Sequence, residues 1–478
     1  MSKVIDLTTG SIRRGISSLA IPLITASFVQ MAYNLTDMIW LGHLGSGSIA
    51  AVGVAGFFLW LCNSLSFTTK VGAEVTISQS LGAGSMKRAS FYANQATFIS
   101  FIFAFMYASF VFIAAPGLVS FFRMEEEISR MAVEYMRIVV PGIFFTFNNN
   151  TFSGIFNGQG NSKTPLKTVA VGLAMNMVLD PLLIYGWGPV PAMGTAGAAI
   201  ATAFSQFVVF AIFIWRLYIR HTPLGKMRWL VQPSYNLIKR VVALGLPVSM
   251  QSALFAMFSM TLGSMAATWG HIGVAVQSIG AQIEAVTWMT AAGFSTALAS
   301  FVGQNYGARN FVRIRKGYSF TLVLAVSISL TATFAFLFFG GELFSIFVND
   351  PETIAAGRDY MMILAASQIF CSLEMVTAGA FNGSGRTVPP AITGILLNGA
   401  RLPMAWLLMN TSLGLNGIWW SVSISSILKG LVLAVWYLYF RKRLESGRDA
   451  SVRKGIYRPI KNFGKRVYVS IASRLWQQ

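Results

Sequence analysis

The sequence predicts an all-α integral membrane protein of twelve transmembrane helices, arranged as two six-helix bundles related by pseudo-two-fold symmetry along the membrane normal. Three observations predict this class: the apolar composition, the spacing of the apolar stretches and an internal repeat. Of the 478 residues, 55% are hydrophobic and 11% are charged, whereas soluble globular proteins carry roughly 25% charged residues. This composition is typical of a chain solvated by lipid.

The transmembrane spans are apolar windows bounded by charged residues, glycine or proline, because a helix needs about 20 apolar residues to cross the hydrocarbon core. The first six windows cover residues 16–41, 51–79, 92–120, 131–157, 164–186 and 194–219. The second six cover residues 236–267, 272–302, 317–340, 355–382, 389–411 and 416–440. No sizeable soluble domain fits between them.

Positive charge alternates between the loops. The formal charge is +20, and Lys and Arg residues gather in the loops after even-numbered spans, as at Lys87, Arg88 and residues 309–316. The loops at 186–194 and 410–416 contain neither Lys nor Arg. Since positively charged loops are retained on the cytoplasmic side, we expect a multi-pass protein of the plasma (inner) membrane with both termini in the cytoplasm. Topology therefore explains the basic charge better than nucleic-acid binding does.

A shift of 225 residues aligns the chain with itself. The shift pairs Pro22 with Pro247, Gln79 with Gln304, and the turn at 156–160 with the turn at 381–385, and its register holds over some 140 residues. Each half has an even number of spans, so the halves enter the membrane in the same direction, as in many transporters. We expect an N-terminal lobe over residues 1–225 and a C-terminal lobe over 226–440.

The remaining segment, residues 441–478, is expected to be a basic cytoplasmic tail. It holds eleven Lys and Arg residues against two acids. Aromatic and aliphatic residues lie between the basic ones, so the tail could lie on the anionic inner surface of the membrane. A disordered basic tail is the alternative.

Short motifs recur in both halves. They are residues 20–22, the loops at 79–83 and 303–308, and the turns at 156–160 and 381–385. In order, spacing and duplication, these motifs resemble the multidrug and toxic compound extrusion (MATE) family over about residues 12 to 440. The resemblance implies a twelve-helix, two-lobed antiporter that exports organic, often cationic, compounds using a proton or sodium gradient.

Few ionisable residues fall inside the spans. Inserting one into the membrane costs about 2.5–3.5 kcal/mol of free energy, so each is a candidate for a functional role. Asp37 and Asp180 lie in the outer halves of the first and fifth spans. Asn176 shares a helical face with Asp180, so an amide and a carboxylate can converge on one small ion. The candidate cation-coupling residues are Asp37, Asn176, Asp180, Thr36 and Asn34, and Tyr33 could add an oxygen.

Two acids that face each other at low dielectric suit proton exchange, while the same oxygens could hold Na+ at Asp37, Asn176 and Asp180. The alternative is that each acid caps a helix or is hydrogen-bonded structurally. The resemblance also implies a cation site at these three positions. The sodium-coupled branch of the family has further acids in the seventh and tenth spans, but residues 247–267 contain none. Coupling is therefore expected in the N-terminal lobe.

The candidate substrate-binding residues are Asp37, Glu284, Glu374 and Arg401. Glu284 could neutralise a cationic substrate or simply pair with Arg401, and Glu374 could contact substrate or be hydrogen-bonded structurally. The chain has 22 Met and 38 Phe residues, and a cleft rich in such side chains adapts to varied apolar cations.

Pro22 and Pro247 occupy corresponding positions in the first and seventh spans and favour a bend there. Our hypothesis is that bending at Pro22 is linked to protonation of Asp37 and so to substrate release. Static kinks are the alternative.

No Walker sequence, zincin motif, nucleophile elbow or dinucleotide fingerprint occurs, so we expect neither an enzyme nor an ATP-driven pump. We expect a monomeric antiporter of small organic, cationic or amphiphilic molecules, embedded in membrane lipids. Its coupling ion would be H+ or Na+, and it would need no cofactor. The rivals are a lipid-linked oligosaccharide flippase, whose pyrophosphate-bearing substrate calls for Arg and Lys in the cleft, and a channel or scaffold.

Overall fold

The computed structural model describes residues 5–219, 224, 227 and 232–446. Two compact units divide the chain, Met1–Ala434 and Val435–Gln478. Across the described ranges the regular secondary structure is helical, apart from an isolated bridge between Trp187 and Val190, and loops join the helices. The expected lobe boundary between residues 225 and 226 lies outside the described residues, as does most of the expected tail.

The helices of the first half are α1 (Ile12–Gly42), α2 (Ser46–Gly82), α3 (Met86–Ser120), α4 (Glu126–Gly158), α5 (Lys163–Tyr185) and α6 (Gly194–Ile214). A π-helical turn, η1 (Trp215–Ile219), continues α6. The helices of the second half are α7 (Tyr235–Ala267), α8 (Gly270–Gly307), α9 (Phe311–Ser345), α10 (Pro351–Gly383), α11 (Val388–Gly399), α12 (Arg401–Met409) and α13 (Leu415–Glu445).

Eleven of the described helical segments are long and apolar enough to cross a membrane, with α11 and α12 taken together. The twelfth segment is α4, whose first turn carries Glu126 and Glu127. The predicted all-α membrane fold of twelve spans is therefore confirmed. Helices begin before the apolar windows because their first turns are polar: Ser85 caps α3, and its repeat equivalent Asn310 caps α9.

The eleventh predicted span is broken in two. α11 ends at Gly399 and α12 begins at Arg401. Pro403 has no N–H to donate to the carbonyl of Gly399, which accounts for the interruption. The break places Arg401 at the first position of a helix within the span.

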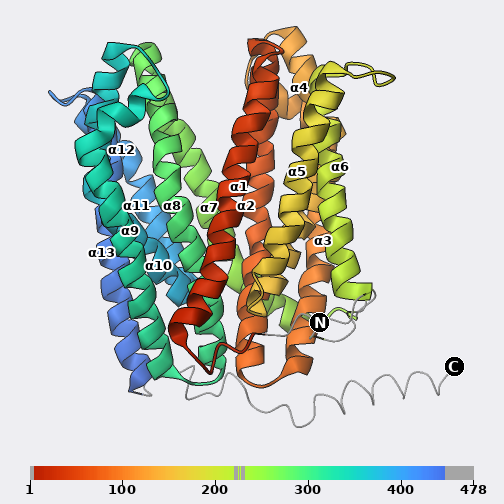
Figure 1. Ribbon diagram of the computed structural model, residues 1–478, viewed down its shortest axis with the longest axis vertical. Helices are drawn as coiled ribbons and strands as arrows, with labels where there is room; N and C mark the ends of the chain where they lie inside the picture. Colours follow the sequence, from red (N-terminus) through yellow and green to blue (C-terminus); the bar gives the residue numbers. More distant parts are fainter. Residues whose placement is uncertain (1–4, 220–223, 225–226, 228–231, 447–478) are drawn as a thin grey trace. The chain divides into compact units, whose positions relative to one another are not determined.

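The same packing pattern recurs in each half. α2 packs on α4 and α8 packs on α10, while α1 packs on α5 and α7 packs on α11. Figure 1 shows the helices of the first half, α1 to α6, grouped together, with α8 to α13 grouped beside them. The sequence repeat is therefore also a structural repeat.

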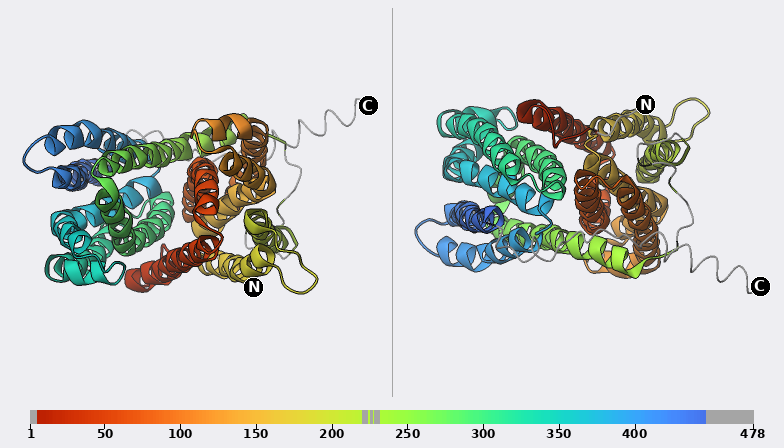
Figure 2. Two further views of the ribbon diagram at one scale, coloured as in Figure 1. Left: turned by 90° about the horizontal axis from the view of Figure 1, so that it is seen from above. Right: turned by 90° about the horizontal axis from the view of Figure 1, so that it is seen from below.

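The two halves meet where α1 and α2 contact α7 and α8 (Figure 2). We call the contacts of residues 64–82 of α2 with residues 241–252 of α7 and 300–307 of α8 the seam. The Ser64 and Ser252 hydroxyls hydrogen-bond across it at 2.9 Å. At Gly82 the backbones touch, because a Cβ there would overlap the carbonyl of Gln304.

Candidate functional site

Asp37 on α1 and Asp180 on α5 are brought together in the first half, with their carboxyl groups within interaction range of each other. Asn176, one turn before Asp180, donates from Nδ2 to Asp180 Oδ1 at 3.1 Å. Asn176 and Asp180 are 2% and 1% exposed. The packing of α1 on α5 therefore unites the three residues that the sequence singled out for a cation.

This cluster is unusual because some of its buried acceptor oxygens have no hydrogen-bond donor within the described residues. An ionised carboxylate only accepts hydrogen bonds, so Asp37 and Asp180 can hydrogen-bond to each other only when one of them carries a proton. Asp180 Oδ2 and Asn176 Oδ1 are buried and receive no donated hydrogen bond within the described part of the chain. Buried oxygens without donors suit a proton or a small hard cation. The described residues contain no cluster of three or more His, Cys, Asp or Glu side chains that could hold a metal.

Two tyrosines and a threonine complete the surroundings of the pair. Tyr33 on α1 and Tyr135 on α4 both lie near Thr202 on α6, and both are within electrostatic range of the two acids. Sequence reasoning offered Tyr33 as a possible oxygen but missed Tyr135 and Thr202. The only signal for Tyr135 was its repeat partner Tyr360, and Thr202 lies in an apolar stretch that carried none.

The other two candidate coupling residues lie apart from this hydrogen-bonded cluster. The Thr36 hydroxyl donates to the Ala32 carbonyl of its own helix at 2.9 Å. Asn34 is exposed and accepts from Gln30 Nε2 at 3.1 Å. Neither side chain hydrogen-bonds to Asp37 or Asp180 within the described part of the chain.

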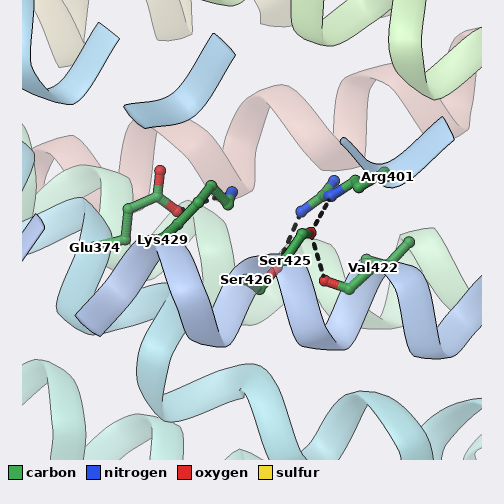
Figure 3. A network of polar contacts seen from close by, with 6 residues as sticks. All are labelled: Glu374, Arg401, Val422, Ser425, Ser426 and Lys429. Atoms are coloured by element: carbon green, nitrogen blue, oxygen red, sulfur yellow. Dashed lines mark hydrogen bonds and ion pairs between the residues drawn. The ribbon is translucent and has the colours of Figure 1, made fainter. Parts of the chain in front are cut away.

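Glu284 on α8 lies in a separate polar cluster in the second half. Its carboxylate accepts from Gln368 Nε2 at 2.9 Å and from Tyr360 Oη at 3.2 Å, both on α10. Arg401 attracts Glu284 electrostatically. However, the Arg401 guanidinium is held by α13, where Nε donates to Ser425 Oγ at 2.6 Å and Nη2 donates to Ser426 Oγ at 2.9 Å (Figure 3).

Glu374 on α10 forms an ion pair with Lys429 on α13, with 3.0 Å between Oε2 and Nζ (Figure 3). The two side chains are 11% and 6% exposed, so the pair is shielded from water. A buried carboxylate with an ammonium partner has its charge compensated within the protein. Glu374 and Glu284 therefore each have a basic residue nearby, Lys429 and Arg401, unlike the two acids of the first half.

The two prolines lie inside continuous helices. α1 runs through Pro22 and α7 runs through Pro247. Close to Pro22, a Cβ on Gly293 of α8 would crowd the backbone of Ile24. The start of α1 is thus packed against the second half, while its later turns carry Asp37.

The model of the MatE family matches residues 22–182 and again residues 247–407. The chain belongs to the MatE family. Both ends of the second match lie 225 residues after those of the first, which is the register of the internal repeat. The MatE chain is therefore a multi-pass membrane transporter made of two copies of one family unit.

Individual proteins resemble this MatE chain over most of its length. The probable multidrug resistance protein NorM of Thermotoga maritima is 27% identical over 434 residues, which are 89% of this chain and 92% of that protein. A crystal structure of MATE in complex with MaL6 matches with a TM-score of 0.87 at 26% identity, covering 93% of this chain and all of the other. An outward-facing multidrug resistance MATE transporter matches with a TM-score of 0.84 at 27% identity, covering 93% of this chain and 99% of the other.

Proposed function

We propose that this chain exports small organic molecules, cationic or amphiphilic, in exchange for protons or sodium ions, by exposing a site between its halves alternately to the two sides of the membrane. It would do so in the cell membrane as a monomer, with both termini in the cytoplasm. The name of the Thermotoga relative, a probable multidrug resistance protein, supports export of several compounds.

One observation carries the proposed coupling. Asp37 and Asp180 lie within interaction range of each other, and buried oxygens of Asp180 and Asn176 have no donor within the described residues. Without a proton or cation, two ionised carboxylates in contact would repel each other strongly at low dielectric. The cluster therefore takes up one small cation when it is intact and would release that cation when α1 moves relative to α5.

The second half supports coupling through the first half. Its two candidate acids already have partners: Lys429 for Glu374, and Tyr360 and Gln368 for Glu284. Glu374, which has an ammonium partner, has little to gain from an incoming cation, whereas the direct partners of Glu284 are neutral and leave it able to attract a cationic substrate. We assign Glu284 to substrate contact, and Glu374 with Lys429 and Arg401 to holding α10, α12 and α13 in place.

The seam supports alternating access. Its contacts involve the later turns of α2 and α8, which precede the basic loops at residues 83–88 and 308–316. If those loops are cytoplasmic, the structure is closed on that side, as expected of a transporter open to the outside. One of the similar solved structures is described as outward-facing.

The flippase is the less favoured alternative. Its pyrophosphate-bearing substrate calls for several available basic groups, but Lys429 is paired with Glu374 and Arg401 donates to two serine hydroxyls. Lys70 lies over the ring of Phe67, 5.1 Å from its centroid, with Glu74 one turn away. The MatE family match also favours export of small molecules over lipid flipping.

Bending of α1 at Pro22 is a proposed link between ion and cargo. The residues around Pro22 pack on α8, whereas Asp37 lies four turns further along the same helix. Protonation of Asp37 would change how tightly α1 is held to α5 and allow it to bend at the proline. A bent α1 would displace cargo from the space between the halves.

A flux assay tests the proposed function. Proteoliposomes that contain the chain are loaded with a cationic dye, and a proton gradient or a sodium gradient is imposed separately. We expect one of the gradients to drive dye efflux, and we expect Asp37→Asn to lose most of this efflux. Glu134→Gln is the matched control, because it neutralises an exposed acid of the same half.

Dye flux that is independent of both gradients and unchanged in Asp37→Asn would indicate a channel instead. Flux of an undecaprenyl-type lipid in place of the dye would favour the flippase.

A further inference from the structure

Residues 5–9, which precede α1, lie across the closed end of the seam. Ile5 donates from its backbone N to the Gln159 carbonyl in the α4–α5 turn at 3.3 Å. Leu7 donates from its backbone N to Gln304 Oε1 of α8 at 2.9 Å, and its carbonyl accepts from Asn305 Nδ2 at 3.1 Å. Leu7 is only 1% exposed. The segment therefore bonds to both halves at once.

The internal repeat shows that this segment is an addition to a symmetric contact. Gln79 and Gln304 are repeat equivalents, and Gln79 Nε2 donates to the Gly383 carbonyl of the opposite half at 3.0 Å. The equivalent acceptor for Gln304 is the Gly158 carbonyl. Instead, Gln304 Nε2 donates to the Ile5 carbonyl at 3.3 Å. On this side the N-terminal segment has been inserted between the glutamine and the turn.

An arginine fastens the same segment to α9. Arg313 donates from Nε to the Leu7 carbonyl at 3.1 Å and from Nη2 to the Thr9 carbonyl at 2.6 Å. The segment is also stiffened internally, because the Asp6 carboxylate accepts from Thr8 N at 2.8 Å and from the hydroxyls of Thr8 and Thr9. Hydrogen bonding from Thr8, together with the nearby Arg313 charge, lowers the pKa of Asp6 below its ordinary value.

We infer that residues 5–9 form a strap that locks the closed end of the seam, with Leu7 as its buried anchor and Arg313 as its clamp. The inference rests on the proposed function, because a transporter that alternates must separate the two halves at this end. The strap must then leave Gln304 or Gln159 in every cycle. It biases the protein toward the conformation seen in the structure, and its release is a step of opening.

A cysteine at the seam measures this opening directly. Ser78 is fully buried, and its hydroxyl donates to the Val75 carbonyl of its own helix at 3.1 Å, while its side chain faces Gly303 across the seam. Ser78→Cys is made in a full-length chain that has Cys62→Ala and Cys371→Ala. The rate of its reaction with a hydrophilic maleimide is followed in detergent, where the seam must open for labelling to occur.

We expect Arg313→Ala to raise the labelling rate about tenfold, which corresponds to about 1.4 kcal/mol. Arg315→Ala is the matched control, because Arg315 is exposed and lies two residues further along α9. Leu7→Asp should act in the same direction, with Ile5→Asp as its control since Ile5 is 37% exposed. If Leu7→Asp fails to fold, as judged by size-exclusion elution, the inference is tested by comparing the labelling rates of Arg313→Ala and Arg315→Ala alone.

Equal labelling rates in Arg313→Ala and Arg315→Ala would contradict the inference that residues 5–9 lock the seam. Its failure is separable from that of the proposed function, because labelling needs neither an ion gradient nor cargo. Faster labelling of Arg313→Ala without Asp37-dependent efflux would support the strap and contradict the proposed function. Asp37-dependent efflux with unchanged labelling would support the proposed function and contradict the strap.

Discussion

The carboxyl groups of Asp37 and Asp180 lie within interaction range of each other across the contact between α1 and α5. This contact has consequences beyond the first half, because α1 also packs on α8. A change in the charge of the pair alters the attraction between α1 and α5, and so acts on a helix that touches both halves. Ion exchange and movement at the seam can be coupled through this one helix.

The first prediction separates Asn176 from Thr36. Asn176→Leu removes the donor to Asp180 Oδ1, and a hydrogen bond to a charged group is worth about 1.5–3 kcal/mol. We expect the initial rate of gradient-driven dye efflux to fall about tenfold or more. Thr36→Ala should transport normally, because the Thr36 hydroxyl bonds to its own helix. Equal losses in the two variants would contradict the arrangement of the cluster.

The second prediction concerns the buried pair Glu374 and Lys429. Lys429→Met leaves a buried carboxylate without its partner, which should destabilise the protein by about 3–5 kcal/mol. The double variant Glu374→Met/Lys429→Met should recover most of this loss in thermal unfolding in detergent. The control is Arg441→Met, which breaks a more exposed contact of 3.9 Å with Glu445 and should cost less than about 1 kcal/mol. A double variant as unstable as the single one would show that Lys429 acts through something other than this pair.

The third prediction tests the close approach of α2 and α8. Gly82→Ala places a methyl group against the Gln304 carbonyl, so the helices must separate at a cost of about 1–3 kcal/mol. Gly53→Ala on the same helix meets no atom within 4 Å and should be neutral or stabilising by up to about 1 kcal/mol. Thermal unfolding of the two variants in one detergent checks this order. The reverse order would mean that the seam tolerates a wider gap.

The fourth prediction is a pH dependence at the start of α10. Asp350 Oδ2 accepts from Thr353 N at 3.0 Å and from Thr353 Oγ1 at 2.6 Å. These bonds, the Thr353 hydroxyl first, hold the pKa of Asp350 below its ordinary 3.8. The stabilisation is therefore complete above the unfolded pKa and is lost as the pH falls through the folded pKa.

Asp350→Asn keeps a capping side chain that does not titrate. The difference in Tm between the native chain and Asp350→Asn, followed from neutral pH to about pH 3, should shift in favour of the variant at the acidic end. A difference that stays constant would exclude a titrating cap.

The spans and the repeat could be predicted from the sequence because lipid imposes them locally. A window of about 20 apolar residues is a requirement of each helix by itself, and the duplication preserves its register. The break between α11 and α12 was not predicted, although Pro403 within the span was the available signal. The short segment at residues 5–9 has no periodicity, so nothing in it indicated that Leu7 would be buried between the halves.

The candidate site was predictable only in part, because the sequence shows which residues share a helical face but not how the helices pack. Asn176 and Asp180 share one helix, so their spacing indicated that they lie together. Tyr135 on α4 lies within electrostatic range of the acids, and Thr202 on α6 lies near Tyr135. Both positions depend on how four helices pack. Asn34 and Thr36 are near Asp37 in sequence, but their side chains hydrogen-bond within α1. Closeness along the chain was a poorer guide than the helical face.

The most direct measurement of the central claim is ion release from the purified chain when cargo binds. A cationic dye is added to the protein in weakly buffered detergent, and released protons are followed with a pH indicator, or bound radioactive sodium is counted. We expect cargo to displace one of these ions from the native chain and from Glu134→Gln, and to displace neither from Asp37→Asn/Asp180→Asn. Undiminished ion release from the double variant, with dye still bound, would contradict the account.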